Sequence, residues 1–238
     1  LNDMGAGGPA GGILNEGALT LAQSTVTGNN AGASDSAAVA NFGTITLQDC
    51  IVSDNPTGGI NNSGSMALID TVVRGNARAG IVNWTGEATL DRCSVDHNAF
   101  RGVYNHEGQM TLDNSAVTDN GTPGNWAEGP GVYNWWGTVT LNNCTVSGNA
   151  GSAGGGLYMA RYAALNLNSC TVSNNTAYNY GGGMYVEEGV ATIRNTLLAG
   201  NRGGMGPSDC AHGQGTIVSA GHNLVSSTSR CTFIADAT

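Results

Sequence analysis

The chain consists of similar segments that follow one another, and this repetition constrains its fold more than any other feature. The segment GVYNHEGQMTLDNSAVTDN begins at residue 102, and GVYNWWGTVTLNNCTVSGN begins at residue 131. Eight such segments lie between residues 11 and 201, and the shortest are 21 to 22 residues apart. A repeat of this length indicates a solenoid, in which each unit buries its apolar face only by stacking on its neighbours.

Each segment is expected to form three short strands. In the segment at 131 these are GVYN, TVTL and CTVS, and apolar and small polar residues alternate within each of them. A period of two is the pattern of a β-strand, and neither a helical period nor helix caps are present. Three strands in each unit predict an all-β fold, a parallel β-helix with three strands per coil and about eight to nine coils stacked ~4.8 Å apart.

Apolar residues recur at three positions of the repeat and are predicted to form the core. Because the coils stack in register, each position becomes a column along the rod, and like residues pack well in such columns. The predicted core columns are Val26, Val52, Val73, Val95, Val117, Val146, Val172 and Leu198; Leu21, Leu47, Leu68, Leu90, Leu112, Leu141, Leu167 and Ile193; and Val39, Ile60, Ile81, Val103, Val132, Leu157 and Met184.

Two further columns consist of asparagine. The closing column is Asn29, Asn55, Asn76, Asn98, Asn120, Asn149, Asn175 and Asn201, and the inner column is Asn15, Asn41, Asn62, Asn83, Asn105 and Asn134, after which Met159 and Val186 take its place. Stacked amides can hydrogen-bond along a column, and Asn tolerates the left-handed backbone of a sharp corner. We interpret both columns as structural, and a row of ligand-binding amides is the alternative.

The repeat unit, G-G-[IVL]-x-N-x-G-x-[LV]-T-[LI]-x-[ND]-[CST]-T-[VI]-S-x-N, resembles the right-handed parallel β-helix repeat of bacterial surface and secreted proteins, including the polymorphic outer-membrane-protein type. The resemblance covers residues 11 to 201. It implies an extracellular or bacterial cell-surface location, but no particular activity, because this solenoid carries many functions. It also implies a longer parent protein, and open coil ends would allow a homo-oligomer or filament to form by end stacking.

The domain division follows from the same resemblance. Residues 1–206 are expected to form the β-helix repeats, and residues 207–238 an irregular final coil of the kind such proteins carry. The tail PSDCAHGQGTIVSAGHNLVSSTSRC suggests a disulfide between Cys210 and Cys231, consistent with an oxidising compartment. Cys50, Cys93, Cys144 and Cys170 share a column with Ser and Thr, which indicates a position that requires a small residue. A bridge between Cys144 and Cys170 in adjacent coils fits disulfide geometry poorly.

Composition excludes several classes of function. The formal net charge is -9, so the basic surface that a nucleic acid requires is not available. An acidic polysaccharide would also be repelled unless a cation bridged it. No apolar run approaches the roughly 20 residues of a membrane-spanning helix. No C-x-x-C or H-x-x-x-H spacing supports a zinc site, and we predict no metal or other cofactor.

Aromatic residues gather at neighbouring positions of successive coils, beside the corner where every insertion follows the closing Asn (31–37, 121–130, 150–155, 176–182 and 202–214). Loops gathered on one side of a rigid scaffold often carry binding sites. Aromatic faces on an extended surface suit sugar rings or a protein partner, although stacking that only stabilises the sheet is the alternative. The candidate ligand-binding residues are Trp84, Tyr104, Trp126, Tyr133, Trp135, Trp136, Tyr158 and Tyr185.

Acidic residues provide the test for an enzyme. A glycosidase needs two carboxylates roughly 5 to 9.5 Å apart, and a lyase of this architecture often combines carboxylates, calcium and a basic catalyst. The weak catalytic candidates are His106, Glu107 and Glu128. We therefore predict a non-enzymatic extracellular scaffold or adhesin that binds a glycan or surface partner, with a polysaccharide lyase or glycoside hydrolase as the alternative.

Overall fold

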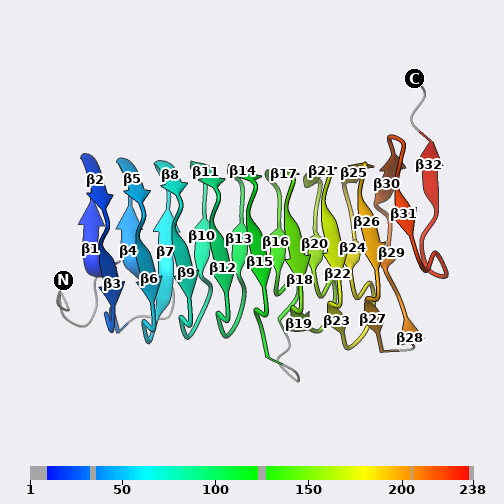
Figure 1. Cartoon of the computed structure of the whole chain (residues 1–238), viewed down its shortest axis with the longest axis horizontal. Coiled ribbons are helices and arrows are strands. Elements are labelled where there is room, and N and C mark those ends of the chain that lie inside the picture. The colour runs from blue at the N-terminus through cyan, green and yellow to red at the C-terminus, as the bar shows by residue number, and fades with distance from the viewer. Residues whose placement is uncertain (1–9, 33–35, 123–126, 205, 236–238) are drawn as a thin grey trace.

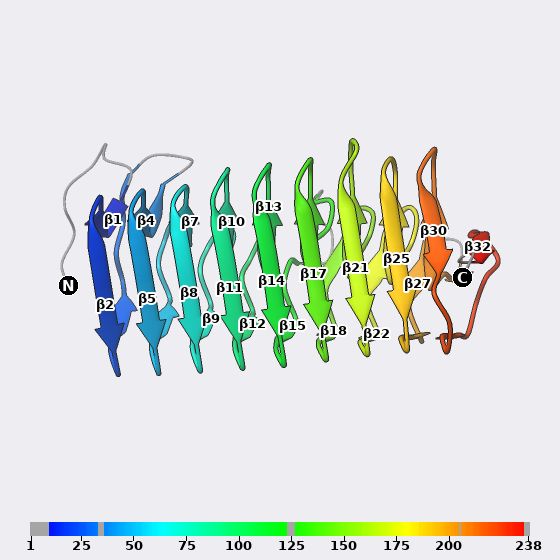
Figure 2. The same cartoon turned by 90° about the horizontal axis from the view of Figure 1, so that it is seen from above.

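The computed structural model describes residues 10–32, 36–122, 127–204 and 206–235. They form a rod of stacked coils, and each full coil contributes one strand to each of three parallel sheets (Figures 1 and 2). The prediction of an all-β parallel β-helix with three strands per coil is confirmed. The first and third sheets have nine strands each, and the second sheet has ten.

The strand boundaries repeat from coil to coil. The first sheet contains β1 (Ala10–Asn15), β4 (Ala37–Asn41), β7 (Gly58–Asn62), β10 (Ile81–Asn83), β13 (Val103–Asn105), β16 (Val132–Asn134), β20 (Leu157–Met159), β24 (Met184–Val186) and β29 (Cys210–His212). The second contains β2 (Ala18–Ala22), β5 (Thr44–Gln48), β8 (Ser65–Ile69), β11 (Glu87–Asp91), β14 (Gln109–Asp113), β17 (Thr138–Asn142), β21 (Ala164–Asn168), β25 (Val190–Arg194), β30 (Thr216–Ser219) and β32 (Phe233–Ala235). The third contains β3 (Thr25–Thr27), β6 (Ile51–Ser53), β9 (Val72–Arg74), β12 (Ser94–Asp96), β15 (Ala116–Thr118), β18 (Thr145–Ser147), β22 (Thr171–Ser173), β26 (Leu197–Ala199) and β31 (Leu224–Val225).

The core lies between the three sheets and has the predicted columns. Ile81 pairs with Val103, Leu90 with Leu112, and Val95 with Val117, so like residues stack in register. All members of the three columns are buried except Leu21, which is partly buried in the first coil. Buried apolar area of this kind is the main stabilising contribution, at roughly 25 cal/mol per Å².

The asparagine columns are hydrogen-bonded ladders, as predicted. In the closing column the Asn98 amide donates to the Asn120 carbonyl oxygen at 3.0 Å, and the Asn120 amide donates to Asn149 at 3.0 Å. The sequence predicted a left-handed backbone at the closing Asn, and this prediction is wrong. The left-handed conformation falls on the residue just before it, such as Asp54 or Asp119. The Asn side chains instead point inward and are buried, where the amides replace the hydrogen bonds of water.

The closing ladder ends on an acidic side chain. Asp209 is buried, and its Oδ1 accepts bonds from the backbone N–H of Asn201 at 3.0 Å and from the Asn201 amide at 2.9 Å. Its Oδ2 accepts bonds from the Ser226 hydroxyl at 2.6 Å and the Ser227 N–H at 2.7 Å. A carboxylate can only accept, so it suits the last position of a column of donors.

The segment after residue 206 adds strands to all three sheets. β29, β30 and β31 pair in parallel with β24, β25 and β26 of the preceding coil. Cys210 and Cys231 form a disulfide with their Cα atoms 5.6 Å apart. Cys50, Cys93, Cys144 and Cys170 are free and buried, so Cys144 and Cys170 are not bridged.

The insertions enter at one corner, as expected, and four short strands form there. These are β19 (Ala150–Gly151), β23 (Thr176–Ala177), β27 (Arg202–Gly203) and β28 (Gly206–Pro207), which make a fourth sheet along the lower edge of Figure 1. An isolated parallel bridge between Glu128 and Ala153 ties the insertion at 121–130 to the next one.

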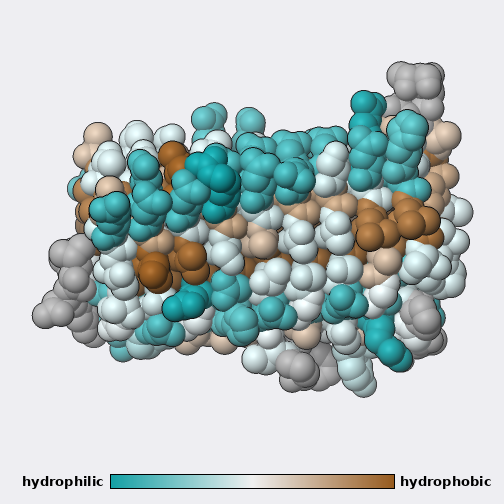
Figure 3. Space-filling model, in the orientation of Figure 1, coloured by the Kyte–Doolittle hydropathy of each residue, from teal (hydrophilic) through white to brown (hydrophobic). Residues whose placement is uncertain are grey.

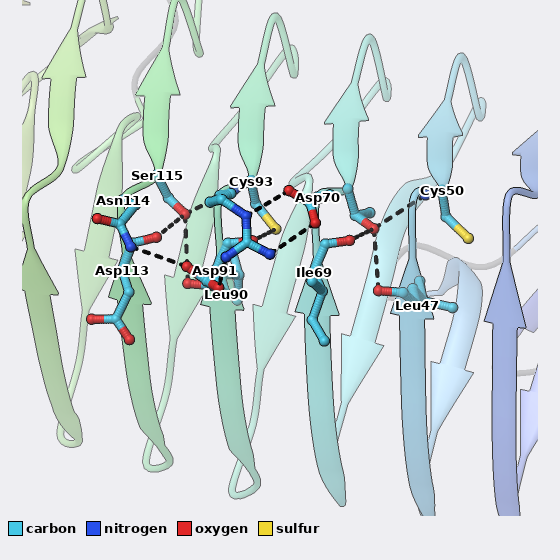
Figure 4. Close-up of polar contacts among 12 residues, drawn as sticks. Leu47, Cys50, Ile69, Asp70, Leu90, Asp91, Cys93, Asp113, Asn114 and Ser115 are labelled. Carbon is cyan, nitrogen blue, oxygen red and sulfur yellow. Dashed lines mark hydrogen bonds and ion pairs between the residues drawn. The ribbon is translucent and has the colours of Figure 1, made fainter.

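The opposite edge of the rod is polar. Figure 3 shows hydrophilic residues in a band along the upper part of the rod, where Figure 1 labels the second sheet. The turns after β8, β11 and β14 carry a network in which Arg92 contacts Asp91 and makes two 2.8 Å bonds to Asp70 (Figure 4). The Asn114 amide extends the network with a 3.1 Å bond to Asp91. These groups pair with one another, so we interpret this edge as structural.

Candidate functional site: the aromatic face

Four tyrosines form a continuous ladder on the outer side of the first sheet. Tyr104, Tyr133, Tyr158 and Tyr185 occupy the same position of β13, β16, β20 and β24 and pair in register. Their ring centroids are 5.2, 5.1 and 5.4 Å apart in order along the rod. Each coil places its ring one coil spacing further along the rod. Neighbouring rings therefore come within the distances of favourable aromatic contacts.

A second aromatic column lies at the turn that follows the inner asparagines. It consists of Trp84, His106 and Trp135, with ring centroids 5.4 and 6.5 Å apart. Trp84 is also 5.9 Å from Tyr104, and Trp135 is 5.9 Å from Tyr133, so the two columns touch. We call the seven residues of both columns the aromatic face.

Glycine allows this turn to be tight. A Cβ atom added to Gly108 would lie 2.1 Å from the Asn83 amide nitrogen and 2.3 Å from the Gly86 carbonyl oxygen. Real atoms do not approach this closely, so a side chain at this position would separate adjacent coils. The close stacking of Gly86 on Gly108 therefore keeps Trp84 and His106 in contact.

The aromatic face is partly a core of its own. Tyr133 and Tyr158 are each only 3% exposed and pack with Ala153 and Ala160. The backbone of the insertions covers them: a Cβ atom on Gly129 would lie 2.8 Å from the Tyr158 Cβ and 3.0 Å from the Tyr133 Cβ. The interpretation that stacking stabilises the sheet therefore applies to these two rings. Trp84, Tyr104, His106, Trp135 and Tyr185 remain partly exposed.

Arg101 links the insertion at 121–130 to the tyrosines. Its guanidinium lies 4.4 Å from the ring centroid of Tyr133 and 4.5 Å from that of Phe100, which are cation–π distances. Its Nε donates to the backbone carbonyl of Glu128 at 2.9 Å. Burial among these groups lowers the pKa of Arg101 from its usual value, and the surrounding tyrosines and Glu128 act in the opposite direction. Arg101 thus fixes the position of the loop that carries Glu128.

Two hollows lie along the aromatic face between Trp84 and Tyr158, and a third, of about 420 Å³, lies at its Tyr185 end beside Tyr180, His212 and Arg230. The first has a volume of about 120 Å³, and its walls include Arg78, Val82, Trp84, Phe100, Arg101 and Tyr104. The second has a volume of about 290 Å³ and is lined by Glu128, Trp135, Tyr158, Arg161, Glu187 and Glu188. The second is close to the lower end of the size range of ligand pockets, which are usually about 300–1,000 Å³.

The second hollow brings together two acidic groups with different surroundings. The Tyr158 hydroxyl donates to Glu187 Oε2 at 2.9 Å. Partial burial raises the pKa of Glu128, and the negative charge of Glu187 raises it further. The pKa of Tyr158 is also raised, first by burial and then by the same carboxylates, so its phenol stays protonated and can donate.

The predicted catalytic residues do not form one group. His106 Nδ1 lies 3.8 Å from Glu107 Oε1, whereas Glu128 lines the hollow with Glu187 and Glu188. Within the described ranges, no hydrogen bond or ion pair joins Glu128 to His106 or Glu107. Trp136 is 51% exposed and makes an edge contact with Tyr162, with centroids 6.4 Å apart. Trp126 lies outside the described residues.

Sequence reasoning missed Arg101, Arg161 and Glu187. Glu187 follows Val186, which pairs through Met159 with Asn134, so it occupies the turn position of Trp135 two coils further on. The register alone could have placed it beside the aromatic face. Arg101 aligns with Ala79 of the preceding coil, so the repeat does not indicate a cation there, and Arg161 lies in a turn that departs from the repeat.

The described residues contain no cluster of three or more His, Cys, Asp or Glu side chains arranged to hold a metal ion. They also contain no helix with the length and hydropathy needed to cross a membrane.

These observations define a repeat protein of the parallel β-helix class with an aromatic surface along one sheet. The chain belongs to the right-handed β-helix region family, whose model matches residues 39–236. This match confirms the handedness expected from the repeat. No curated protein and no solved structure matches the chain.

Proposed function

We propose that the protein is a scaffold that holds a glycan chain against its aromatic face. The observation that carries the proposal is the unbroken contact of aromatic rings from Trp84 to Tyr185, with Trp84, His106 and Trp135 partly exposed. Sugar rings stack on aromatic faces through their apolar C–H surfaces. Trp84, His106 and Trp135 together span two coil steps, ~10 Å, so the partly exposed rings offer contacts for about two successive sugar residues.

A location outside the cell, of the bacterial surface or secreted type, is part of the same proposal. The repeat unit and the Cys210–Cys231 disulfide support it, because such bonds persist in oxidising compartments. We also propose an adhesive or structural role, in which rods assemble end to end. Electron microscopy of the purified protein tests the assembly, since filaments should be visible and isolated short rods would contradict it.

The binding proposal is tested by removing the exposed rings only. Trp84→Ala and Trp135→Ala should abolish binding on a glycan array, because both rings belong to the second aromatic column and are partly exposed, so that a sugar can reach them. Tyr133 and Tyr158 are unsuitable for this test because they are buried and their loss would destabilise the fold. Phe42→Ala is the matched control, since Phe42 is 52% exposed at the same turn position of an earlier coil. Unchanged binding by both tryptophan variants would contradict the proposal.

A glycoside hydrolase or polysaccharide lyase is the second candidate. The observation in its favour is the hollow that contains both Glu128, whose pKa is raised, and Glu187. Two carboxyl groups in different surroundings are the arrangement that glycoside hydrolysis uses for its acid and its base. A reducing-sugar release assay on any bound glycan tests this function, and Glu128→Gln should abolish release. If the protein binds a glycan but releases no reducing sugar, the enzymatic candidate is excluded and the scaffold function remains.

A further inference from the structure

The coil that follows Tyr185 does not continue the tyrosine ladder. Ala211 of β29 pairs with Tyr185 of β24, so it occupies the ladder position of its coil. Its methyl group is buried and cannot fill the space that a phenol ring takes. The third hollow lies beside Ala211, and its volume of about 420 Å³ is within the usual size range of ligand pockets.

Two tyrosine rings border the third hollow. The centroids of Tyr180 and Tyr185 are 6.0 Å apart and the ring planes differ by 27°, so the rings are stacked. The Arg230 guanidinium lies 5.8 Å from the Tyr180 centroid. Tyr180 is nevertheless 46% exposed, and Tyr185 is partly exposed. Both rings therefore keep accessible surface on which the apolar face of a sugar can stack.

The remaining walls of the third hollow supply hydrogen-bonding groups without a carboxylate. Arg230 has several N–H donors, and His212 has two ring nitrogens. Among the described residues that line this hollow none is acidic, whereas three glutamates line the second hollow. A few polar groups beside aromatic walls are typical of a small-molecule site, and the hydroxyl groups of a sugar can bond to them.

The Cys210–Cys231 disulfide joins the two sides of the third hollow. Ala211 and His212 follow Cys210 in β29, and Arg230 precedes Cys231. The Cα atoms of the two cysteines are 5.6 Å apart, and both residues are buried. Beside the bridge, His212 Nε2 lies 2.8 Å from the Thr232 hydroxyl. The bridge thus sets the separation between β29 and the segment that carries Arg230.

The segment that carries Arg230 has few other restraints. Residues 226–232 connect β31 to β32 and form no strand. Ser226 and Ser227 bond to Asp209, and pairing with β30 begins again only at Phe233. A connecting segment adopts many conformations unless it is tied down. The disulfide is the covalent restraint next to Arg230, so we attribute the position of this side of the hollow to it.

We propose that the third hollow is a further subsite for one sugar residue of the glycan, and that the Cys210–Cys231 disulfide is required to form it. This inference rests on the proposed function, because the subsite extends the surface that begins at Trp84. Trp84 and Tyr185 are four coil steps apart, ~19 Å, so a glycan that spans both has at least about four sugar residues. A thiol reductant transfers two electrons and two protons to the bridge and gives two thiols, which removes the subsite.

The test compares trimers and hexamers of β-1,4-linked glucose and of β-1,4-linked N-acetylglucosamine by isothermal titration calorimetry on the oxidised chain. A trimer covers the two coil steps from Trp84 to Trp135, whereas a hexamer also reaches the third hollow. The hexamer of the sugar that binds should have about tenfold higher affinity than its trimer, because it gains contacts with two further rings. Reduction with a dithiol should remove this advantage and leave the affinity for the trimer unchanged.

Variants locate the effect. Tyr180→Ala, and the double variant Cys210→Ser with Cys231→Ser, should also remove the advantage of the hexamer without changing trimer binding. Tyr178→Ala is the matched control, because Tyr178 belongs to the same insertion, is 70% exposed and does not line the third hollow. Thermal unfolding monitors folding. If the cysteine variant does not fold, reduction of the unchanged protein and Tyr180→Ala still decide.

The outcomes separate this inference from the proposed function. Equal affinity for trimer and hexamer, or an advantage that persists in Tyr180→Ala, would overturn the subsite and leave glycan binding at the exposed tryptophans. An advantage lost in Tyr180→Ala but kept after reduction would overturn the role of the disulfide. If none of the four oligomers binds, the inference is overturned, and a glycan array without any bound glycan would overturn the proposed function as well.

Discussion

Replacement of Asn120 by Ala tests whether the closing ladder stabilises the rod. Asn120 is fully buried, and its side chain takes part in four hydrogen bonds of 2.9 to 3.0 Å. It accepts from the N–H and the amide of Asn98, and it donates to the Val95 carbonyl and to Asn149. The loss of each bond costs about 1 kcal/mol, and a buried N–H that is left unsatisfied costs about 1–3 kcal/mol. We therefore expect Asn120→Ala to lower the free energy of unfolding by about 4 kcal/mol.

Urea denaturation followed by circular dichroism measures this change from the shift of the midpoint. Asn168→Ala is the control, since Asn168 belongs to a partly exposed ladder and donates one 2.8 Å bond to Asn142. Its replacement should cost about 1 kcal/mol or less. If Asn120→Ala costs no more than Asn168→Ala, the buried ladder is not a major source of stability and the reasoning is wrong.

Four further predictions concern other parts of the rod. Asp209→Ala removes the four bonds that end the closing ladder and should lower the free energy of unfolding by about 3 kcal/mol, measured by urea denaturation; a loss below about 1 kcal/mol would contradict its role. Gly108→Ala should lower the melting temperature by several degrees, because its Cβ would lie 2.1 Å from the Asn83 amide nitrogen, whereas Gly17→Ala, which meets nothing within 4 Å, serves as the control. Mass spectrometry after alkylation in denaturant should find four modified thiols without reductant and six with it, since Cys210 and Cys231 are bridged. In the native protein at pH 8 the Cys93 thiol should react slowly, because burial raises its pKa to about 11. Six thiols modified without reductant would exclude the disulfide.

The repeat predicts the core because its own spacing sets the register. Once Val95 and Val117 are aligned, every residue of the two coils is aligned, so the apolar columns and both asparagine ladders follow without further information. The corner was predicted less well, since Asp119 carries the left-handed conformation and leaves Asn120 free to point inward. Either residue type tolerates that conformation, so composition alone does not decide between them.

The site was predictable only where it belongs to the repeat. Tyr104, Tyr133 and Trp135 follow from the register, and so would Glu187. The burial of Tyr133 and Tyr158 was not predictable, because it depends on the path of the insertion that contains Gly129 and of the one that contains Gly154. Insertions differ from coil to coil, so no neighbouring repeat indicates where their backbone lies.

Both asparagine ladders point the same way along the rod. In the closing column and in the inner column, each amide nitrogen donates to the oxygen of the coil that follows in the sequence. Every coil in the middle of the rod therefore offers an oxygen to the coil before it and an N–H to the coil after it. A duplicated coil inserted between two others would meet a matching partner on each side. The length of the rod can thus change by whole coils without any change to the Asp209 end.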